Sequence, residues 1–97
     1  MKTLYAKVHG NVQGVGYRDL VRRAALHLGI TGSVKNEDDG SVSIIASGED
    51  GSLDRFFKEI KVDYQYGPSV FDIEFMNESP KHTVTDRKGN KSFEVAR

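Results

Sequence analysis

Apolar residues recur along this chain at two spacings, one typical of strands and the other of helices. Apolar and polar residues alternate over residues 4–9, which predicts a half-buried strand. Over residues 20–28 apolar side chains form one helical stripe, and Gly29 follows where a C-terminal cap is expected. The same helical spacing returns in a second segment, at Leu53, Phe56, Phe57 and Ile60.

Between the two predicted helices the pattern is that of a β-hairpin. Residues 33–37 and 41–47 read as strands, and the tripeptide Asp38-Asp39-Gly40 between them is a strong turn signal. We expect three alternating apolar residues of the second of these strands to face the core, namely Val42, Ile44 and Ala46.

The last third of the chain begins with a break at Gly67-Pro68. Alternating apolar residues over 71–75 then predict a fourth strand, and a short final strand is expected near 92–96. The polar, turn-rich segment 77–91 between them receives no functional role.

This order of elements, βαββαβ with a short C-terminal strand, is an α+β arrangement of the ferredoxin-like, split βαβ type. Both helices are expected to cover one face of an antiparallel sheet. Residues 1–97 are predicted to form a single domain, since no repeat or linker interrupts the pattern. Because this fold hosts many functions, the function has to be argued from a site.

Composition narrows the range of partners. The 97 residues include 14 basic and 14 acidic ones, so no overall charge favours nucleic acid or an anionic membrane. There is no cysteine, which removes disulfides, thiolate nucleophiles and cysteine metal sites. Neither a secretory signal nor the roughly 20 apolar residues of a membrane span are visible. We therefore expect a cytoplasmic monomer.

The segment with the clearest chemistry lies between the first strand and the first helix, at residues 10–18, Gly-Asn-Val-Gln-Gly-Val-Gly-Tyr-Arg. Glycines allow backbone conformations in which successive N–H groups converge on one centre, and the following helix contributes its positive end. The guanidinium of Arg18 matches phosphate geometry. These residues predict a cradle for a phosphoryl group.

Several alternatives compete with this interpretation. No Gly-Lys-[Ser/Thr] follows the glycines, as a nucleotide-binding P-loop requires, and the third glycine of a dinucleotide-binding motif is missing. An ordinary tight turn remains open for the glycines, and a surface salt bridge to Asp19 remains open for Arg18. Yet a cation at a helix N-terminus opposes the helix dipole unless an anion compensates it, which favours the phosphate site.

Asn36 is the second candidate, at the end of the first hairpin strand. Taken alone it is typical of a turn-capping asparagine. In the split βαβ order the first and third strands are adjacent and the second pairs with the third, so Asn36 can approach the loop after the first strand. Its amide could there orient a water molecule that attacks a phosphoryl group held by Arg18.

Together these segments resemble the acylphosphatase family. Its first motif, Gly-x-Val-Gln-Gly-Val-x-[Phe/Tyr]-Arg, is matched without a break over residues 10–18. Its second motif places an asparagine before a Gly-x-Val hairpin. The residues that match it are Gly32, Val34, Asn36, Gly40 and Val42, and the resemblance covers at least residues 4–48. Ser33 departs from the pattern, because family members usually carry an aromatic or other bulky residue there.

The resemblance implies a hydrolase acting on acid anhydrides in phosphorus-containing compounds, which cleaves the carboxyl–phosphate bond of small acyl phosphates. It implies that Arg18 and the backbone amides of the loop hold the phosphate, that Asn36 positions the water, and that no metal or other cofactor takes part. The loop residues concerned are Gln13, Gly14, Val15, Gly16, Tyr17 and Arg18.

The other candidates carry weaker signals. His9, His27 and His82 have no metal-ligand spacing. The acidic run 37–39 is typical of a solvated hairpin tip, and the tyrosines of the 64–66 segment could pack beside a substrate or at the edge of the fold. The alternative function is a noncatalytic phosphate- or acyl-phosphate-binding regulatory module of the same fold.

Overall fold

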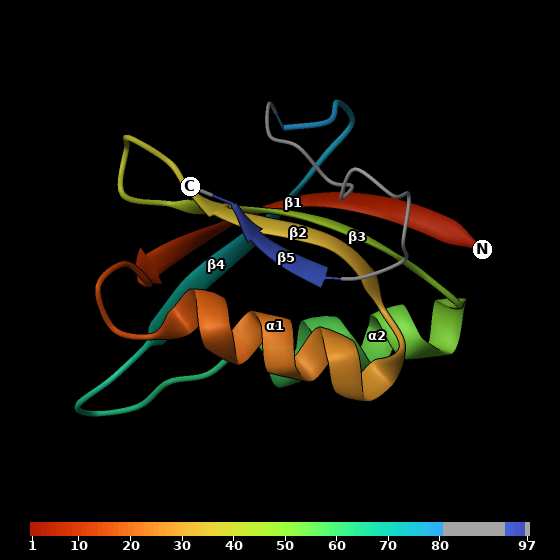
Figure 1. Ribbon diagram of the computed structural model, residues 1–97. Coiled ribbons are helices and arrows are strands. Elements are labelled where there is room, and N and C mark those ends of the chain that lie inside the picture. Colours follow the sequence, from red (N-terminus) through yellow and green to blue (C-terminus); the bar gives the residue numbers. More distant parts are fainter. Residues whose placement is uncertain (81–92, 97) are drawn as a thin grey trace.

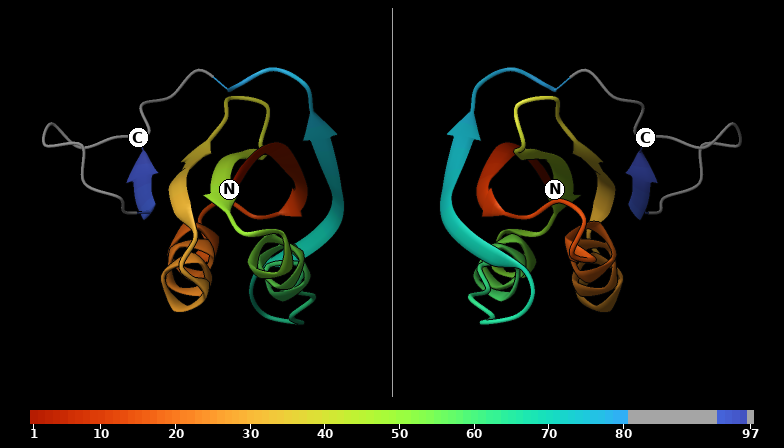
Figure 2. Two further views of the ribbon diagram at one scale, coloured as in Figure 1. Left: turned by 90° about the vertical axis from the view of Figure 1, so that its right-hand side faces the viewer. Right: turned by 90° about the vertical axis from the view of Figure 1, so that its left-hand side faces the viewer.

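Two helices lie on one face of a five-stranded sheet in the computed structural model, which describes residues 1–80 and 93–96 (Figures 1 and 2). This confirms the predicted α+β order of strands and helices. In chain order the elements are β1 (Lys2–Asn11), α1 (Tyr17–Leu28), β2 (Thr31–Asn36), β3 (Val42–Gly48), α2 (Asp50–Glu59), β4 (Ser69–Met76) and β5 (Phe93–Ala96).

The strand order across the sheet is β4-β1-β3-β2-β5. β1 and β2 are both antiparallel to the central strand β3, so they run in the same direction and end at the same edge of the sheet. This is the neighbour relation that the split βαβ order predicts. The residues that follow β1 and the last residues of β2 are therefore brought together.

The prediction of an antiparallel sheet is wrong for the last strand, because β5 pairs with β2 in parallel. β4 is antiparallel to β1, so it ends at the edge of the sheet where β2 begins. β5 begins at that same end of the sheet, with Phe93 opposite Gly32, and therefore runs along β2 in the same direction. The sheet is therefore mixed.

The core lies between the sheet and the two helices. Val42, Ile44 and Ala46 are fully buried, as predicted, and Val21 of α1 and Phe56 of α2 pack against the sheet from the helix side. Burial of these apolar stripes is the main source of stability for such short helices. The result is a rigid support for the β1–α1 loop.

The ends of the predicted elements are partly confirmed. Gly29 is the C-cap of α1, in the left-handed conformation, and its N–H bonds to helix carbonyls. The final strand begins at Phe93 in the described part of the chain. Of the polar segment, residues 81–91 lie outside the described residues, as do Ser92, His82 and Arg97. No helix in the described ranges is long and apolar enough to cross a membrane.

Candidate active site

The loop between β1 and α1 is anchored to the core at both of its ends. The side chains of Val12 and Tyr17 are each only 1% exposed. The Tyr17 hydroxyl donates a hydrogen bond of 2.8 Å to the carbonyl of Ile60, and burial raises the pKa of this phenol above its ordinary value. The loop backbone is therefore anchored on its core side, while its two glycines, 14 and 16, are exposed to solvent.

Gly14 and Gly16 both adopt left-handed backbone conformations, with φ of 72° and 78°. A Cβ added at either position would meet no atom within 4 Å, so crowding does not require glycine there. The requirement is the positive φ, which other residues adopt only with strain. The expected left-handed turn is thus present, and Gly16 is also the N-cap of α1.

The backbone N–H groups of residues 13–18 form a set of unused donors. Within residues 1–80 and 93–96, no carbonyl or side chain accepts a hydrogen bond from any of them. The first N–H groups of a helix lack partners within the helix, and they lie at its positive end. Such an array can bind an anion.

A cavity of about 210 Å³ opens at this loop. Arg18 lines it together with Val95 of β5, and its size suits a small anion better than a nucleotide. The remaining lining residues all come from the loop and the start of α1, namely Val12, Gly14, Gly16, Tyr17 and Asp19.

Arg18 is half-buried, and its guanidinium is directed at β5. Its Nη1 donates a hydrogen bond of 3.3 Å to the carbonyl of Ala96. The alternative of a surface salt bridge to Asp19 is not supported, because that carboxylate pairs with Arg23 at 3.1 Å and Arg22 at 3.7 Å. Among the described residues no carboxylate lies within 4 Å of Arg18, so its charge is not neutralised there.

Asn36 lies at the same end of the sheet and on the same face as the core. Asn36 pairs with Val42 of β3, and Val42 pairs in turn with Val8 of β1. Two residues before it, Val34 is buried under the helices, and residues two apart share a face of a strand. Ala96, the acceptor of the Arg18 bond, pairs with the residue just before Asn36. Through Ala96, Arg18 therefore lies beside the end of β2 that carries Asn36, although Asn36 is not among the residues that line the cavity.

The amide of Asn36 has no hydrogen bond to any described residue. Its Oδ1 is buried and without a partner, an uncommon condition that costs about 1–3 kcal/mol when no water fills the gap. An unpaired amide near a cluster of unused donors is typical of a functional site. Among the described residues, Asn36 therefore caps no turn, which is the common role of an asparagine at such a position.

No sequence pattern predicts a role for the Gln13 side chain, yet this side chain connects the loop with the hairpin. Its Nε2 donates to the carbonyls of Glu37 at 2.7 Å and Ser41 at 2.8 Å. The pattern of the sequence contains no signal for these bonds, because both acceptors are backbone atoms.

The remaining candidates lie elsewhere. His9 bonds to Glu74 at 3.1 Å, and no group of three potential metal ligands occurs in the described ranges. In the acidic run, Asp39 pairs with Lys7 at 2.6 Å, and the two groups shift each other's pKa, lowering that of Asp39 and raising that of Lys7. Tyr64 lines a different cavity, between α1 and α2.

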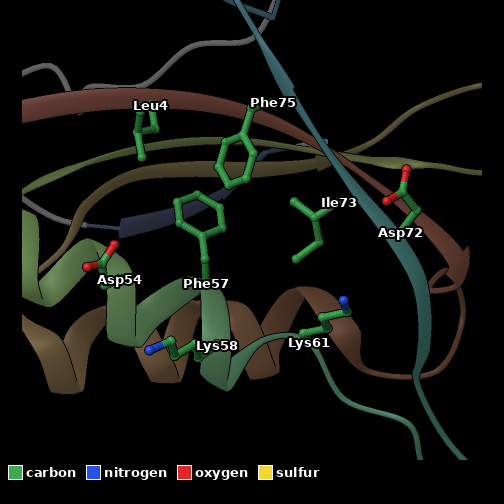
Figure 3. Close-up of a pocket in the computed structure, with 8 residues that line it drawn as sticks. All are labelled: Leu4, Asp54, Phe57, Lys58, Lys61, Asp72, Ile73 and Phe75. Atoms are coloured by element: carbon green, nitrogen blue, oxygen red, sulfur yellow. The ribbon is translucent and has the colours of Figure 1, made fainter.

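A larger cavity, about 480 Å³, lies between α2 and β4 (Figure 3). Phe57 and Phe75 form its apolar floor, with ring centroids 4.9 Å apart. None of the predicted site residues lines it. We place the candidate site at the 210 Å³ cavity, because it combines the unused N–H donors with a guanidinium that has no carboxylate partner among the described residues.

Ser33, the departure from the family pattern, is fully buried but lies next to Val34 in β2 and so faces the opposite side of the sheet. It does not line the cavity at the loop. Any influence of this residue on the site is therefore indirect.

Comparisons with known proteins show which family this chain is similar to. The family model described as acylphosphatase matches residues 4–95. An acylphosphatase of Lactobacillus gasseri is 46% identical over 95 residues, covering 98% of both chains, and one of Thermotoga maritima is 52% identical over 60 residues, 62% of this chain and 67% of that one. The crystal structure of acylphosphatase from Bacillus subtilis superposes with a TM-score of 0.79 at 32% identity, covering 98% of each chain.

Proposed function

Because this chain belongs to the acylphosphatase family and is a hydrolase of small acyl phosphates, we propose that it works with two catalytic residues, Arg18 and Asn36. The phosphoryl group lies against the loop of residues 13–18, and its oxygens accept hydrogen bonds from the unused backbone N–H groups. The guanidinium of Arg18 supplies the positive charge. The unused donors and the unpaired cation in one small cavity are the observation that carries this proposal.

Asn36 orients the attacking water. An O–H of the water donates to the unpaired Oδ1 of the amide, which leaves a lone pair of the water oxygen directed at phosphorus. Since no hydrogen bond to a described residue holds this amide, it is free to turn toward the water. The amide is not basic, so it positions the water rather than removing its proton.

The chemistry of acyl phosphates needs little more than this. The leaving carboxylate has a conjugate acid with a pKa of about 4, so it departs at neutral pH without a general acid. Phosphoryl transfer through a loose transition state requires mainly positioning and anion stabilisation. Backbone amides, one arginine and one asparagine are sufficient, and we propose that no metal or other cofactor takes part.

The noncatalytic regulatory module is less well supported. Its binding site would be the same loop, but a module that only binds phosphate does not need an unpaired amide beside it. The curated relatives that match across the chain carry the name of an enzyme. Catalysis is therefore the function we propose.

Turnover of benzoyl phosphate in the presence of a chelator tests the mechanism. Arg18→Ala should lose both turnover and inhibition by inorganic phosphate, because the cation that binds the anion is gone. Asn36→Ala should lose turnover, by roughly 100-fold or more, while phosphate inhibition stays near that of the wild type. Wild-type rates in both variants, or loss of activity with chelator, would contradict the proposal.

Three further predictions from the sequence belong here. We propose that residues 1–97 form one domain, that the protein acts as a monomer, and that it acts in the cytoplasm. The absence of cysteine supports the last of these. Light scattering of the purified chain tests the oligomeric state. Fractionation of cells tests the location of the protein.

A further inference from the structure

We propose that the side chain of Gln13 is a positioning residue for catalysis, which holds the hairpin carrying Asn36 at a fixed place beside the phosphate-binding loop. The inference rests on the function proposed above. The side chain of Gln13 holds the hairpin, whereas the backbone N–H of the same residue is one of the donors proposed to bind phosphate.

The Gln13 amide bonds to the residue that follows β2 and to the residue that precedes β3. Its Nε2 donates to the carbonyls of Glu37 at 2.7 Å and Ser41 at 2.8 Å. The same two residues close the turn, since the N–H of Glu37 donates to Ser41 O at 2.9 Å and that of Gly40 to Glu37 O at 3.2 Å. An amide NH₂ group carries two donor hydrogens, so both bonds can form at once.

These bonds act one residue away from Asn36. Glu37 follows it directly, so holding the Glu37 carbonyl restricts the movement of the Asn36 backbone, which is also paired with Val42. The Asn36 amide itself has no hydrogen bond to a described residue that could hold it. Its location therefore depends on the backbone, and the backbone is tied to the loop through Gln13.

The sheet pairing and the Lys7–Asp39 ion pair hold the hairpin to β1, but the contact between the hairpin and the loop itself is made by Gln13. Of the loop residues 12–16, only Gln13 forms a hydrogen bond to the hairpin there. The turn itself has independent support, because Asp39 accepts from the N–H and the hydroxyl of Ser41 and pairs with Lys7. Loss of the Gln13 amide should thus leave the hairpin folded but free to shift relative to the loop.

Such a shift affects the reaction more than the binding. The phosphate donors and Arg18 are on the loop side and keep their mutual geometry, whereas the water held by Asn36 moves away from the line of attack. Reaction rates are sensitive to displacements of this kind, and a misplacement of about 1 Å can lower a rate roughly 100-fold.

The test is Gln13→Met, which preserves length and removes the donors. We expect kcat for benzoyl phosphate to fall by roughly 10- to 100-fold, while the inhibition constant of inorganic phosphate stays close to the wild-type value. The matched control is Gln65→Met, which makes the same substitution at an exposed residue that bonds only to the neighbouring Tyr66 among described residues and should leave kcat unchanged. If Gln13→Met does not fold, Gln13→Asn, whose amide is too short to reach both carbonyls, is judged by the same criteria.

A double variant separates positioning from a general structural role. If Gln13 acts through Asn36, then Gln13→Met added to Asn36→Ala should lower residual turnover no further, because coupled residues are not additive. A further fall in the double variant, an unchanged kcat, or weakened phosphate inhibition in Gln13→Met overturns the inference and leaves the roles of Arg18 and Asn36 standing. Full turnover of Asn36→Ala alone would overturn both proposals.

Discussion

At the scale of single residues, Gly16 shows how backbone conformation and binding are combined in this loop. It is the N-cap of α1 and has a φ of 78°, a left-handed conformation at the start of the helix. Because the space above it is open, a methyl group there would meet no protein atom but would lie where the phosphate is proposed to bind. A side chain at this position should therefore affect stability and binding together.

We expect Gly16→Ala to destabilise the fold by about 1–2 kcal/mol, the usual cost of a left-handed conformation for a residue with a Cβ, and to weaken phosphate inhibition. Urea denaturation and an inhibition assay measure the two effects. Gly51→Ala is the control, since Gly51 lies in α2 with open space around its Cα and no positive φ. That change should stabilise the protein by up to about 1 kcal/mol, and equal losses in both variants would contradict the argument.

At the scale of elements, the β2–β3 hairpin is held by an acidic turn and not by its apolar strands alone. Asp39 accepts hydrogen bonds from Ser41 and pairs with Lys7 of β1 at 2.6 Å. Lys7 and Ser41 hold the pKa of Asp39 far below its usual range. A carboxyl with a lowered folded-state pKa contributes stability above its unfolded pKa, and this contribution is lost as the pH falls toward the folded value.

Asp39→Asn should therefore lower the urea midpoint at pH 7, and the difference from the wild type should shrink as the pH drops below about 4, the ordinary pKa of the group. The measurement is a series of urea titrations between pH 7 and pH 2. Asp38→Asn serves as the control, because its exposed carboxylate has no partner among the described residues. A difference between wild type and Asp39→Asn that does not change with pH would contradict the electrostatic origin.

At the scale of the whole molecule, β5 joins the site to the core. Phe93 is 3% exposed and packs on Phe56 of α2, with ring centroids 5.9 Å apart. Three residues later the carbonyl of Ala96 accepts from Arg18. The arginine that we propose to be catalytic thus bonds to a strand that is held both by its pairing with β2 and by one buried ring.

Phe93→Ala should destabilise the protein by about 3–5 kcal/mol, as expected when a buried aromatic ring is removed. Turnover should also fall under conditions where the variant is still folded, since Arg18 loses a fixed acceptor. Denaturant titration and benzoyl phosphate kinetics measure both. Phe71→Ala, at a ring that is 75% exposed, should change stability by no more than about 0.5 kcal/mol. If folded Phe93→Ala turned over benzoyl phosphate at the wild-type rate, the orientation of Arg18 by β5 would not matter for activity.

Much of the fold and site could be predicted because the information is local. The alternation over residues 4–9 and the helical stripe over 20–28 report which side of each element is buried, and both agree with the structure. The glycines at 14 and 16 indicate the left-handed turn, since only glycine adopts it without strain. The placement of Asn36 near the loop followed from the strand order alone.

The chain's own sequence thus determined the strands and helices and the left-handed turn at residues 14–16, and it predicts Arg18 and Asn36 as the residues that act there. Tertiary structure decided the parallel pairing of β5, the acceptor of Arg18 and the Gln13 bridge. The Gln13 and Arg18 bonds end on backbone carbonyls 24 and 78 residues away along the chain. Every residue has such a carbonyl, so no side-chain pattern identifies the partner until the fold brings the two together.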